Sequence, residues 1–164
     1  MKFFGCKRLL TVFYLFLLCV DIASKIGAIV WIPPIFRGEY PFGGIGVFSN
    51  FFGISFSLNY IENTGAAWGM FPGYPSLLFG IRVMVILGLI AYLIFHNKKE
   101  LWLIAVGAIG NALDFILYGH VIDFFHFTFW GYSFPVFNFA DSYITIGALC
   151  LIFFEFFKKS PQPV

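Results

Sequence analysis

Residues 101–129 read LWLIAVGAIGNALDFILYGHVIDFFHFTF, and this stretch decides the fold. Its first part, 101–118, is apolar and close to the length of about 20 residues with which a helix crosses the hydrocarbon core of a bilayer. Over 125–129, apolar and polar side chains alternate, which is the period of a half-buried strand. A span that leads into a strand predicts a helical membrane protein with a small sheet resting on one surface.

The composition of the whole chain agrees with a membrane environment. Of its 164 residues, 60% are hydrophobic and 11% are charged, whereas a soluble domain carries roughly a quarter charged residues. The high aromatic content also excludes a disordered chain. The net charge of +2 gives no basic field for binding nucleic acid. Three scattered cysteines show no metal-binding spacing, so we interpret them as packing residues.

Three further stretches share the length and apolar character of 101–118. The four predicted spans cover roughly 9–31, 76–95, 101–118 and 140–157. Basic residues precede the first span, as they do in a cleavable signal peptide. Asp21 and Lys25 interrupt the expected cleavage region, however, so we interpret it as a retained span. Because the chain has neither an internal repeat nor a low-complexity linker, we expect a single membrane-embedded domain over 1–164.

Lysine and arginine clusters near the span ends predict the orientation of the chain. One cluster precedes the first span, a second lies between the second and third spans, and a third follows the fourth. Their members are Lys2, Lys7, Arg8, Lys98, Lys99, Lys158 and Lys159. With four spans, all three clusters fall on one side, which must be cytoplasmic. Both termini are therefore expected in the cytoplasm, and residues 32–75 and 119–139 are expected to face outward.

The outward segments show the pattern of strands. Apolar and polar residues alternate over 54–60 as they do over 125–129, and Gly131 can turn the chain back toward the fourth span. The glycine-rich part of the first outward segment is expected to be a loop that contains Gly38, Pro41, Gly43, Gly44 and Gly46. The predicted fold class is therefore an all-α integral membrane protein with four transmembrane helices and a small extracytoplasmic β-sheet.

Ionisable side chains inside the spans are costly and usually mark function, although structural ion pairs are an alternative. Asp21 and Lys25 stand four residues apart and can pair on one helix face; this fits an orienting ion pair and a catalytic support role about equally well. Arg82 lies near the outer end of the second span, and we interpret it mainly as an interfacial anchor. Asn111 and Asp114 share a face of the third span, where by themselves they fit helix packing.

Two aspartates at the predicted outer interface are candidates for catalysis. Asp123 follows the third span and Asp141 opens the fourth, so the topology brings both to one short outward loop. Two neighbouring carboxylates share a proton, and one acts as base toward a water while the other acts as acid toward a carbonyl. This is the chemistry of an aspartic protease. A structural alternative is that Asn138 and Asp141, three residues apart, form a helix capping box.

Taken together, these motifs resemble those of the bacterial lipoprotein signal peptidases, also called signal peptidase II, across nearly the whole chain. The matching motifs are Asp21 with Lys25, Asn63-Thr64-Gly65-Ala66-Ala67, Gly110-Asn111 with Asp114, Val121-Ile122-Asp123, and Phe137-Asn138-Phe139-Ala140-Asp141-Ser142. Each motif alone is weak, but five in this order on four spans are specific. Phe115 stands where the family usually has arginine, which puts a substrate contact in question but leaves the two aspartates untouched.

The resemblance implies a membrane aspartic endopeptidase at the outer face of the bacterial cytoplasmic (inner) membrane. It would remove the signal peptide from prolipoproteins whose cysteine carries a diacylglyceryl group, and it would cut just before that cysteine. Asp123 and Asp141 would be the catalytic dyad. The residues implied to bind substrate or brace the dyad are Asp21, Lys25, Asn63, Gly65, Gly110, Asn111, Asp114, Asn138 and Ala140. Members of the family are targets of the cyclic peptide globomycin, and neither a metal nor an organic cofactor is implied.

The main alternative is a small membrane transporter or channel subunit that uses aspartate and lysine for ion or proton relay. It predicts ionisable residues near mid-membrane and along several spans. In this chain such residues gather toward one surface, and the cytoplasmic halves of the spans are nearly bare of them. The peptidase is therefore favoured.

Overall fold

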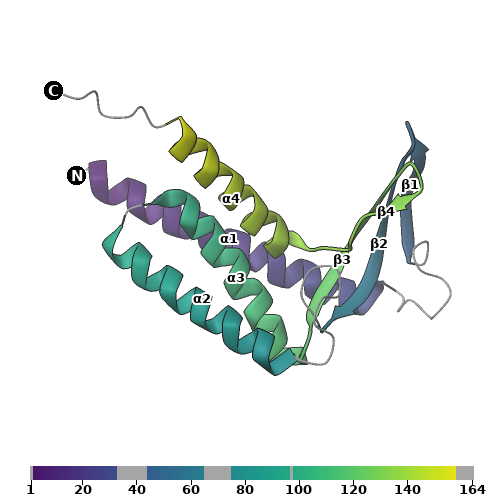
Figure 1. The fold of residues 1–164 in the computed structure, drawn as a ribbon, viewed down its shortest axis with the longest axis horizontal. Coiled ribbons are helices and arrows are strands. Elements are labelled where there is room, and N and C mark those ends of the chain that lie inside the picture. Colours follow the sequence, from purple (N-terminus) through teal and green to yellow (C-terminus); the bar gives the residue numbers. More distant parts are fainter. Residues whose placement is uncertain (1, 33–43, 65–74, 97, 158–164) are drawn as a thin grey trace.

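The computed structural model describes residues 2–32, 44–64, 75–96 and 98–157. These residues form the helices α1 (Lys2–Trp31), α2 (Pro75–Phe95), α3 (Lys99–Tyr118) and α4 (Phe139–Phe156). They also form an antiparallel sheet, in the order β1 (Ile45–Phe51), β2 (Ile54–Asn63), β3 (Val121–Phe129) and β4 (Tyr132–Ser133). Figure 1 shows the helices as an elongated bundle with the sheet at one end, and α4 splays away from the other helices toward its own C-terminal end.

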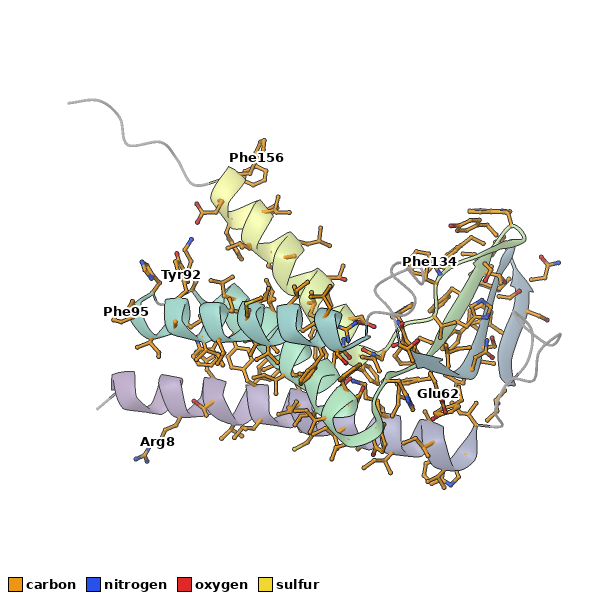
Figure 2. All side chains as sticks on the ribbon, turned by 60° about the horizontal axis from the view of Figure 1, so that its bottom comes forward. Arg8, Glu62, Tyr92, Phe95, Phe134 and Phe156 are labelled. Carbon is orange, nitrogen blue, oxygen red and sulfur yellow. The ribbon has the colours of Figure 1, made fainter. Side chains whose placement is uncertain are left out.

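The helices present an apolar surface of the kind that lipid covers. Three of the described helices contain segments that are long and apolar enough to cross a membrane: Arg8–Trp31, Leu101–Tyr118 and Phe139–Phe156. A shorter apolar segment, Phe79–Phe95, lies in α2. Large apolar side chains on the helices are strongly exposed, among them Phe95 at 81% and Phe156 at 86%, and Figure 2 shows both at the end of the bundle away from the sheet. Water would penalise such a surface, whereas hydrocarbon would not.

The predicted helices and two of the predicted strands are confirmed. Each of the four apolar stretches coincides with a helix, although α1 begins well before the predicted start of its span. The alternating stretches 54–60 and 125–129 fall inside β2 and β3, which pair with each other in register from Ile54 opposite Phe129. A turn at Gly131, which has a positive φ of 83°, leads from β3 into β4.

The prediction that Gly46 belongs to a loop was wrong, because Gly46 lies in β1 opposite Ser57 of β2. The register between β1 and β2 shifts on both sides of Phe48, and such bulges break the strict alternation by which a strand is recognised. Gly44 lies just before β1 and has a positive φ of 88°. The other expected loop residues, Gly38, Pro41 and Gly43, lie outside the described residues.

Close packing of α1, α3 and α4 positions the residues that bear chemistry. A Cβ on Gly107 of α3 would lie 2.3 Å from the Ala140 carbonyl oxygen of α4, and a Cβ on Gly110 would lie 2.5 Å from Oδ2 of Asp21 on α1. Only glycine permits these approaches. Gly119, with φ of 79°, then ends α3 and directs the chain into β3. The junction between the helices and the sheet is therefore where polar residues of all these elements meet.

Candidate active site

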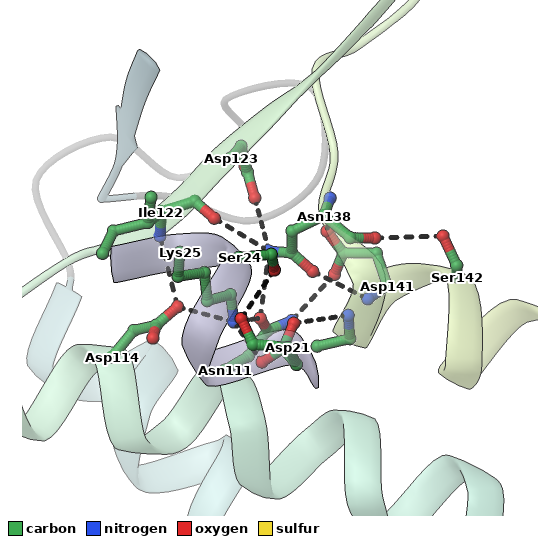
Figure 3. Close-up of polar contacts among 11 residues, drawn as sticks. Asp21, Ser24, Lys25, Asn111, Asp114, Ile122, Asp123, Asn138, Asp141 and Ser142 are labelled. Atoms are coloured by element: carbon green, nitrogen blue, oxygen red, sulfur yellow. Dashed lines mark hydrogen bonds and ion pairs between the residues drawn. The ribbon is translucent and has the colours of Figure 1, made fainter. Parts of the chain in front are cut away.

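Polar side chains from three helices and one strand converge at the junction between the bundle and the sheet, as Figure 3 shows. The sequence-predicted site residues found there are Asp21, Lys25, Asn111, Asp114, Asp123, Asn138 and Asp141. Two groups can be distinguished by their contacts. One is centred on the buried ammonium group of Lys25. The other contains Asp123 and Asp141 and borders a cavity.

The Lys25 cluster consists of Lys25, Asp21, Asp114 and Asn111. The Lys25 ammonium nitrogen lies 2.8 Å from Oδ2 of Asp21 and 2.7 Å from Oδ2 of Asp114, and it donates a hydrogen bond of 3.0 Å to Oδ1 of Asn111. Lys25 and Asp21 are each only 1% exposed. The predicted pairing of Asp21 with Lys25 is confirmed, and Asp114 adds a second carboxylate from α3. The cluster ties α1 to α3, and its single cation offsets one of the two carboxylate charges.

Asp123 is buried in β3 and held by two amide donors. Its Oδ2 accepts a hydrogen bond of 2.8 Å from Nδ2 of Asn63, and its Oδ1 accepts one of 2.7 Å from Nδ2 of Asn138. Burial and the charge of Asp141 raise the pKa of Asp123 to about 7, against the lowering effect of these hydrogen bonds and of Lys25. The carboxyl group is therefore able to exchange a proton near neutral pH.

The prediction that Asp123 lies in a loop was wrong. The residue stands opposite Ile61 in the β2–β3 pairing and is 2% exposed. The strand begins at Val121, almost immediately after α3 ends at Tyr118, so the chain leaves no room for a loop. The local alternation over 125–129 indicated only the later part of this strand.

The two carboxylate oxygens of Asp141 accept hydrogen bonds from two different residues, Asn138 and Asn111. Oδ2 accepts a hydrogen bond of 3.2 Å from the backbone N–H of Asn138, and Oδ1 of Asn138 accepts one of 2.9 Å from the backbone N–H of Asp141. This reciprocal pair is a capping box, so the structural alternative for Asn138 and Asp141 is confirmed as geometry. Oδ1 of Asp141 accepts a hydrogen bond of 2.7 Å from Nδ2 of Asn111. Capping occupies one oxygen and leaves the other on the side of Asn111.

Asp123 and Asp141 both line a cavity of about 610 Å³. Polar groups on its wall also come from β2, α2, α3 and α4, and they belong to Asn63, Arg82, Asn111, Ser142 and Thr145. The remaining wall is apolar, with Phe134 to Phe137 on one side and Ile144 and Ile146 of α4 on another. A largely apolar cavity with a few convergent polar groups is typical of a ligand site. Its volume lies in the range of small-molecule ligand sites, about 300–1,000 Å³.

The other sequence-predicted residues divide into three groups. Asn63 lies at the cavity, where it contacts Asp123. Gly110 and Ala140 serve the packing of the helices; the backbone N–H of Ala140 donates a hydrogen bond of 2.8 Å to Oδ1 of Asp21. Gly65 lies outside the described residues.

Sequence reasoning missed Arg82 and Thr145 as residues of the cavity wall. Thr145 stands four residues after Asp141 on the same face of α4, a spacing that points to the same site. Phe115, which stands where the resemblance leads us to expect an arginine, has a packing role. Its ring stacks on Phe79 of α2 with the centroids 4.8 Å apart and an angle of 14° between the planes, so it packs α2 against α3.

This sequence and this fold are similar to those of known proteins. The family described as signal peptidase (SPase) II matches residues 13–157. A lipoprotein signal peptidase of Chlamydia felis (strain Fe/C-56) is 34% identical over 155 residues, which are 90% of this chain and 91% of that protein. One of Chlamydia pneumoniae is 44% identical over 110 residues, 63% of this chain and 66% of that protein.

A solved structure described as a bacterial membrane enzyme has the same fold, with a TM-score of 0.70 and 26% identity over 95% of each chain. A second, described in the same words, has a TM-score of 0.72 and 24% identity, and the match covers 96% of this chain and 95% of that one. The family match spans most of the sequence, and the similarity extends to the whole fold. The chain therefore belongs to the signal peptidase (SPase) II family.

Proposed function

We propose that the chain is an aspartic endopeptidase that removes the signal peptide from diacylglyceryl-modified prolipoproteins and cuts just before the lipidated cysteine. Membership of the signal peptidase II family and the lipoprotein signal peptidases among its relatives support this activity. The observation that carries the catalytic type is the pair formed by Asp123 and Asp141, which line one cavity and are bridged by one residue. Asn138 donates its side-chain amide to Asp123 and its backbone N–H to Asp141.

The pair supplies an acid and a base from two chemically identical groups. With a pKa of about 7, Asp123 holds a proton under conditions in which an ordinary aspartate is ionised. One carboxylate takes a proton from a water, whose oxygen attacks the carbonyl carbon of the scissile bond, while the protonated carboxyl donates to the carbonyl oxygen. The tetrahedral intermediate then collapses, the C–N bond breaks and the leaving nitrogen receives a proton. The shared proton belongs to the pair as a unit.

The surrounding amides orient this pair. Asn63 and Asn138 donate to Asp123, and Asn111 donates to Asp141. Asn111 is itself fixed, because its Oδ1 accepts from Lys25 at 3.0 Å and from Asn138 at 3.1 Å. The amides therefore orient the two carboxylates, and the Lys25 cluster in turn holds Asn111 in place.

The proposal includes the arrangement in the membrane. All four helices cross the cytoplasmic (inner) membrane, residues 1–164 form one domain, both termini are cytoplasmic, and the sheet and cavity lie at the outer face. Arg8 supports this orientation, because it lies at the end of the bundle away from the sheet (Figure 2). Lys98 supports it as well, because it directly precedes α3, whose first residue lies at that end, and pairs with Glu155. A substrate that is held in the outer leaflet by two acyl chains would meet the cavity at its own depth. Globomycin-type cyclic peptides are expected to compete for the same cavity.

The test is to incubate the purified protein in detergent with a diacylglyceryl-modified prolipoprotein and to analyse the products by mass. Asp123→Asn and Asp141→Asn keep the shape of each side chain but cannot cycle a proton. Each is expected to lower turnover on the order of 10⁴-fold, and the double variant is expected to be little worse, because residues that act as a unit are not additive. Glu155→Gln, at the opposite end of the bundle, is the matched carboxylate-to-amide control and should retain turnover.

Thermal stability of the same variants separates catalysis from capping. Asparagine at 141 retains an acceptor oxygen for the Asn138 N–H, so the loss of stability is expected to stay on the order of 1 kcal/mol. A stable Asp141→Asn protein with turnover close to wild type would assign that residue to helix capping alone and would end the aspartic mechanism.

A further inference from the structure

A second cavity lies on the sheet, next to the cavity that contains the two aspartates. Its volume is about 410 Å³, and every described residue that lines it is apolar. We call it the aromatic groove; its wall residues are Phe48 and Phe51 of β1, Ile54 of β2, Phe127 and Phe129 of β3, and the later Phe134 and Phe137. The last two also line the cavity of the aspartates. A ligand in that cavity can therefore extend past these two rings into the groove.

The aromatic groove and Asp123 lie on one face of β3. Side chains two residues apart along a strand point to the same face, so Asp123 shares its face with Phe127 and Phe129. The register shift between Leu58 and Ile61 places its extra residue in β2, so β3 keeps its alternation. Because a strand rises about 3.3 Å per residue, the groove residues of β3 lie about 13 to 20 Å from Asp123.

One wall of the groove is preformed. Four rings contact one another in a closed circuit with centroids 5.9 to 6.1 Å apart, through the pairs Phe127–Phe129, Phe129–Phe134, Phe134–Phe137 and Phe137–Phe127. Aromatic pairs of this kind are more stable than their buried area alone implies. Across β2 from this circuit, Phe48 and Phe51 of β1 are 42% and 64% exposed. Their rings gain most from a ligand that covers them.

The lining selects for hydrocarbon over peptide. A peptide group that leaves water needs hydrogen-bond partners, and phenylalanine and isoleucine side chains supply none. An acyl chain has no such need. One chain reaches across half of a hydrocarbon core of about 30 Å, hence about 15 Å, which is comparable to the separation between Asp123 and the groove. Figure 1 shows β3 running across the end of the bundle, so the groove stays at the end that is proposed to face outward.

We propose that the aromatic groove binds one acyl chain of the diacylglyceryl group while the scissile bond lies at Asp123 and Asp141. The inference rests on the proposed function and deepens it, because it assigns a part of the substrate to the sheet. Each buried methylene contributes about 0.8 kcal/mol, which is about fourfold in affinity. The groove therefore makes cleavage depend on the length of the acyl chain.

Two synthetic lipopeptides of one sequence test this dependence. One carries full-length acyl chains, and in the other both chains are truncated to a few carbons. Phe51→Ser removes an exposed ring from the groove, and Ile54→Trp fills the groove while keeping it apolar. Phe52→Ser is the matched control, because Phe52 is 81% exposed and adjoins Phe51 but does not line the groove.

The readout is kcat/KM for both lipopeptides in the same detergent, where partition of the substrates is common to all variants and cancels in their comparison. Phe51→Ser and Ile54→Trp are each expected to lower kcat/KM for the full-length substrate about tenfold, and for the truncated substrate much less. The change is expected in KM, because the groove is remote from the reacting bond. Phe52→Ser should keep the wild-type preference for full-length chains.

Photocrosslinking locates the chain without relying on turnover or on the folding of a groove variant. The Asp141→Asn protein is incubated with a full-length lipopeptide that has a photoreactive group near the end of one acyl chain. After irradiation, mass analysis of the digested protein is expected to find adducts in β1, β2 and β3. Adducts confined to the helices would overturn the inference, because the chain would then lie in the surrounding lipid or detergent.

The kinetic outcomes that overturn the inference are also distinct. Equal losses for both lipopeptides in Phe51→Ser would assign the groove to the peptide, and an equal effect of Phe52→Ser would assign these rings to general contact with the membrane. A length preference that Phe51→Ser and Ile54→Trp leave unchanged, with both lipopeptides cut, would mean that only this inference fails and that a bilayer lipid or nothing occupies the groove. If the wild-type protein cuts neither lipopeptide, the proposed function itself fails.

Discussion

The Lys25 cluster and the aspartate pair lie side by side at the same junction, but their buried carboxylates have different partners. In the cluster, one ammonium lies within 2.8 Å of two carboxylates and also donates to an amide oxygen. In the pair, two carboxylates face a cavity and are held by amide N–H groups from Asn63, Asn111 and Asn138. In the first arrangement a cation lies between two carboxylates, whereas in the second the two carboxylates are held by neutral amide donors.

On the proposed aspartic mechanism, this difference separates a structural site from a reactive one. In the cluster, Lys25 lies between the two carboxylates and offsets part of their repulsion. In the aspartate pair, burial and then the charge of Asp141 raise the pKa of Asp123 and favour its retaining a proton. Both sites use aspartate, so the residue type alone does not determine the role. The nearest charged partner does.

The largest expected effect comes from removing the cation of the Lys25 cluster. Lys25→Met leaves Asp21 and Asp114 buried without a cation and is expected to destabilise the protein by about 3–5 kcal/mol. Thermal unfolding in detergent measures it. Lys98→Met, which breaks the more exposed pair with Glu155, is the matched control and should cost no more than about 1 kcal/mol. Equal stability of the two variants would show that the cluster is not a structural centre.

A smaller effect is expected at the residue that joins the two sites. Asn111 accepts from Lys25 through Oδ1 and donates to Asp141 through Nδ2. Asn111→Asp retains an acceptor for Lys25 but places a carboxylate where Asp141 contacted a donor, so it should lower kcat by about 10- to 100-fold and destabilise the protein through like-charge repulsion. Asn111→Ala removes both contacts without adding a charge and should also lower kcat and the unfolding temperature. If neither variant changes kcat, the two sites do not share this residue in the way described.

Per pH unit, the smallest effect is a dependence on pH. Above about pH 7 the pair loses its shared proton, so cleavage is expected to fall by about tenfold per pH unit. Stability follows the same group. Its pKa is higher in the native state than the ordinary value of 3.8, so the native state binds the proton more tightly. Stability should therefore decline as pH rises from about 4 to about 7 and then level off.

Asp123→Asn provides the control for the stability measurement, because it removes the group that titrates. Its unfolding temperature should lose this decline between pH 4 and 7, while the rest of the profile is retained. A decline of the same size in the variant would mean that another group titrates in this range and that the pair is less strongly coupled than the geometry indicates.

Hydropathy and local spacing predicted much of this molecule. Apolar length located the helices, and the four-residue spacing of Asp21 and Lys25 predicted a pair that the structure contains. The spacing of Asn138 and Asp141 predicted a capping box that is also present. These features depend on residues close together in the chain, where the geometry of a single helix fixes which side chains meet.

The remaining features depend on contacts that spacing does not encode. Asp123 is buried because β2 pairs with β3, and no local pattern around the aspartate indicates this partner. β1 escaped recognition because bulges interrupt its alternation. Arg82 stands in a helix that is apolar over most of its length, so helical periodicity does not identify the side that faces the cavity. Only the assembled neighbours define that side.

Asn138 has a consequence for how the protein matures. The same side chain caps the first turn of α4 and donates to Asp123, to the Ile122 carbonyl and to Asn111. Formation of the last helix and alignment of the two aspartates are therefore one event. A chain whose synthesis has stopped before α4 contains Asp123 but neither its bridge nor its partner. On the proposed aspartic mechanism such a nascent chain has no working site, so the protease stays inactive until its final helix is in position.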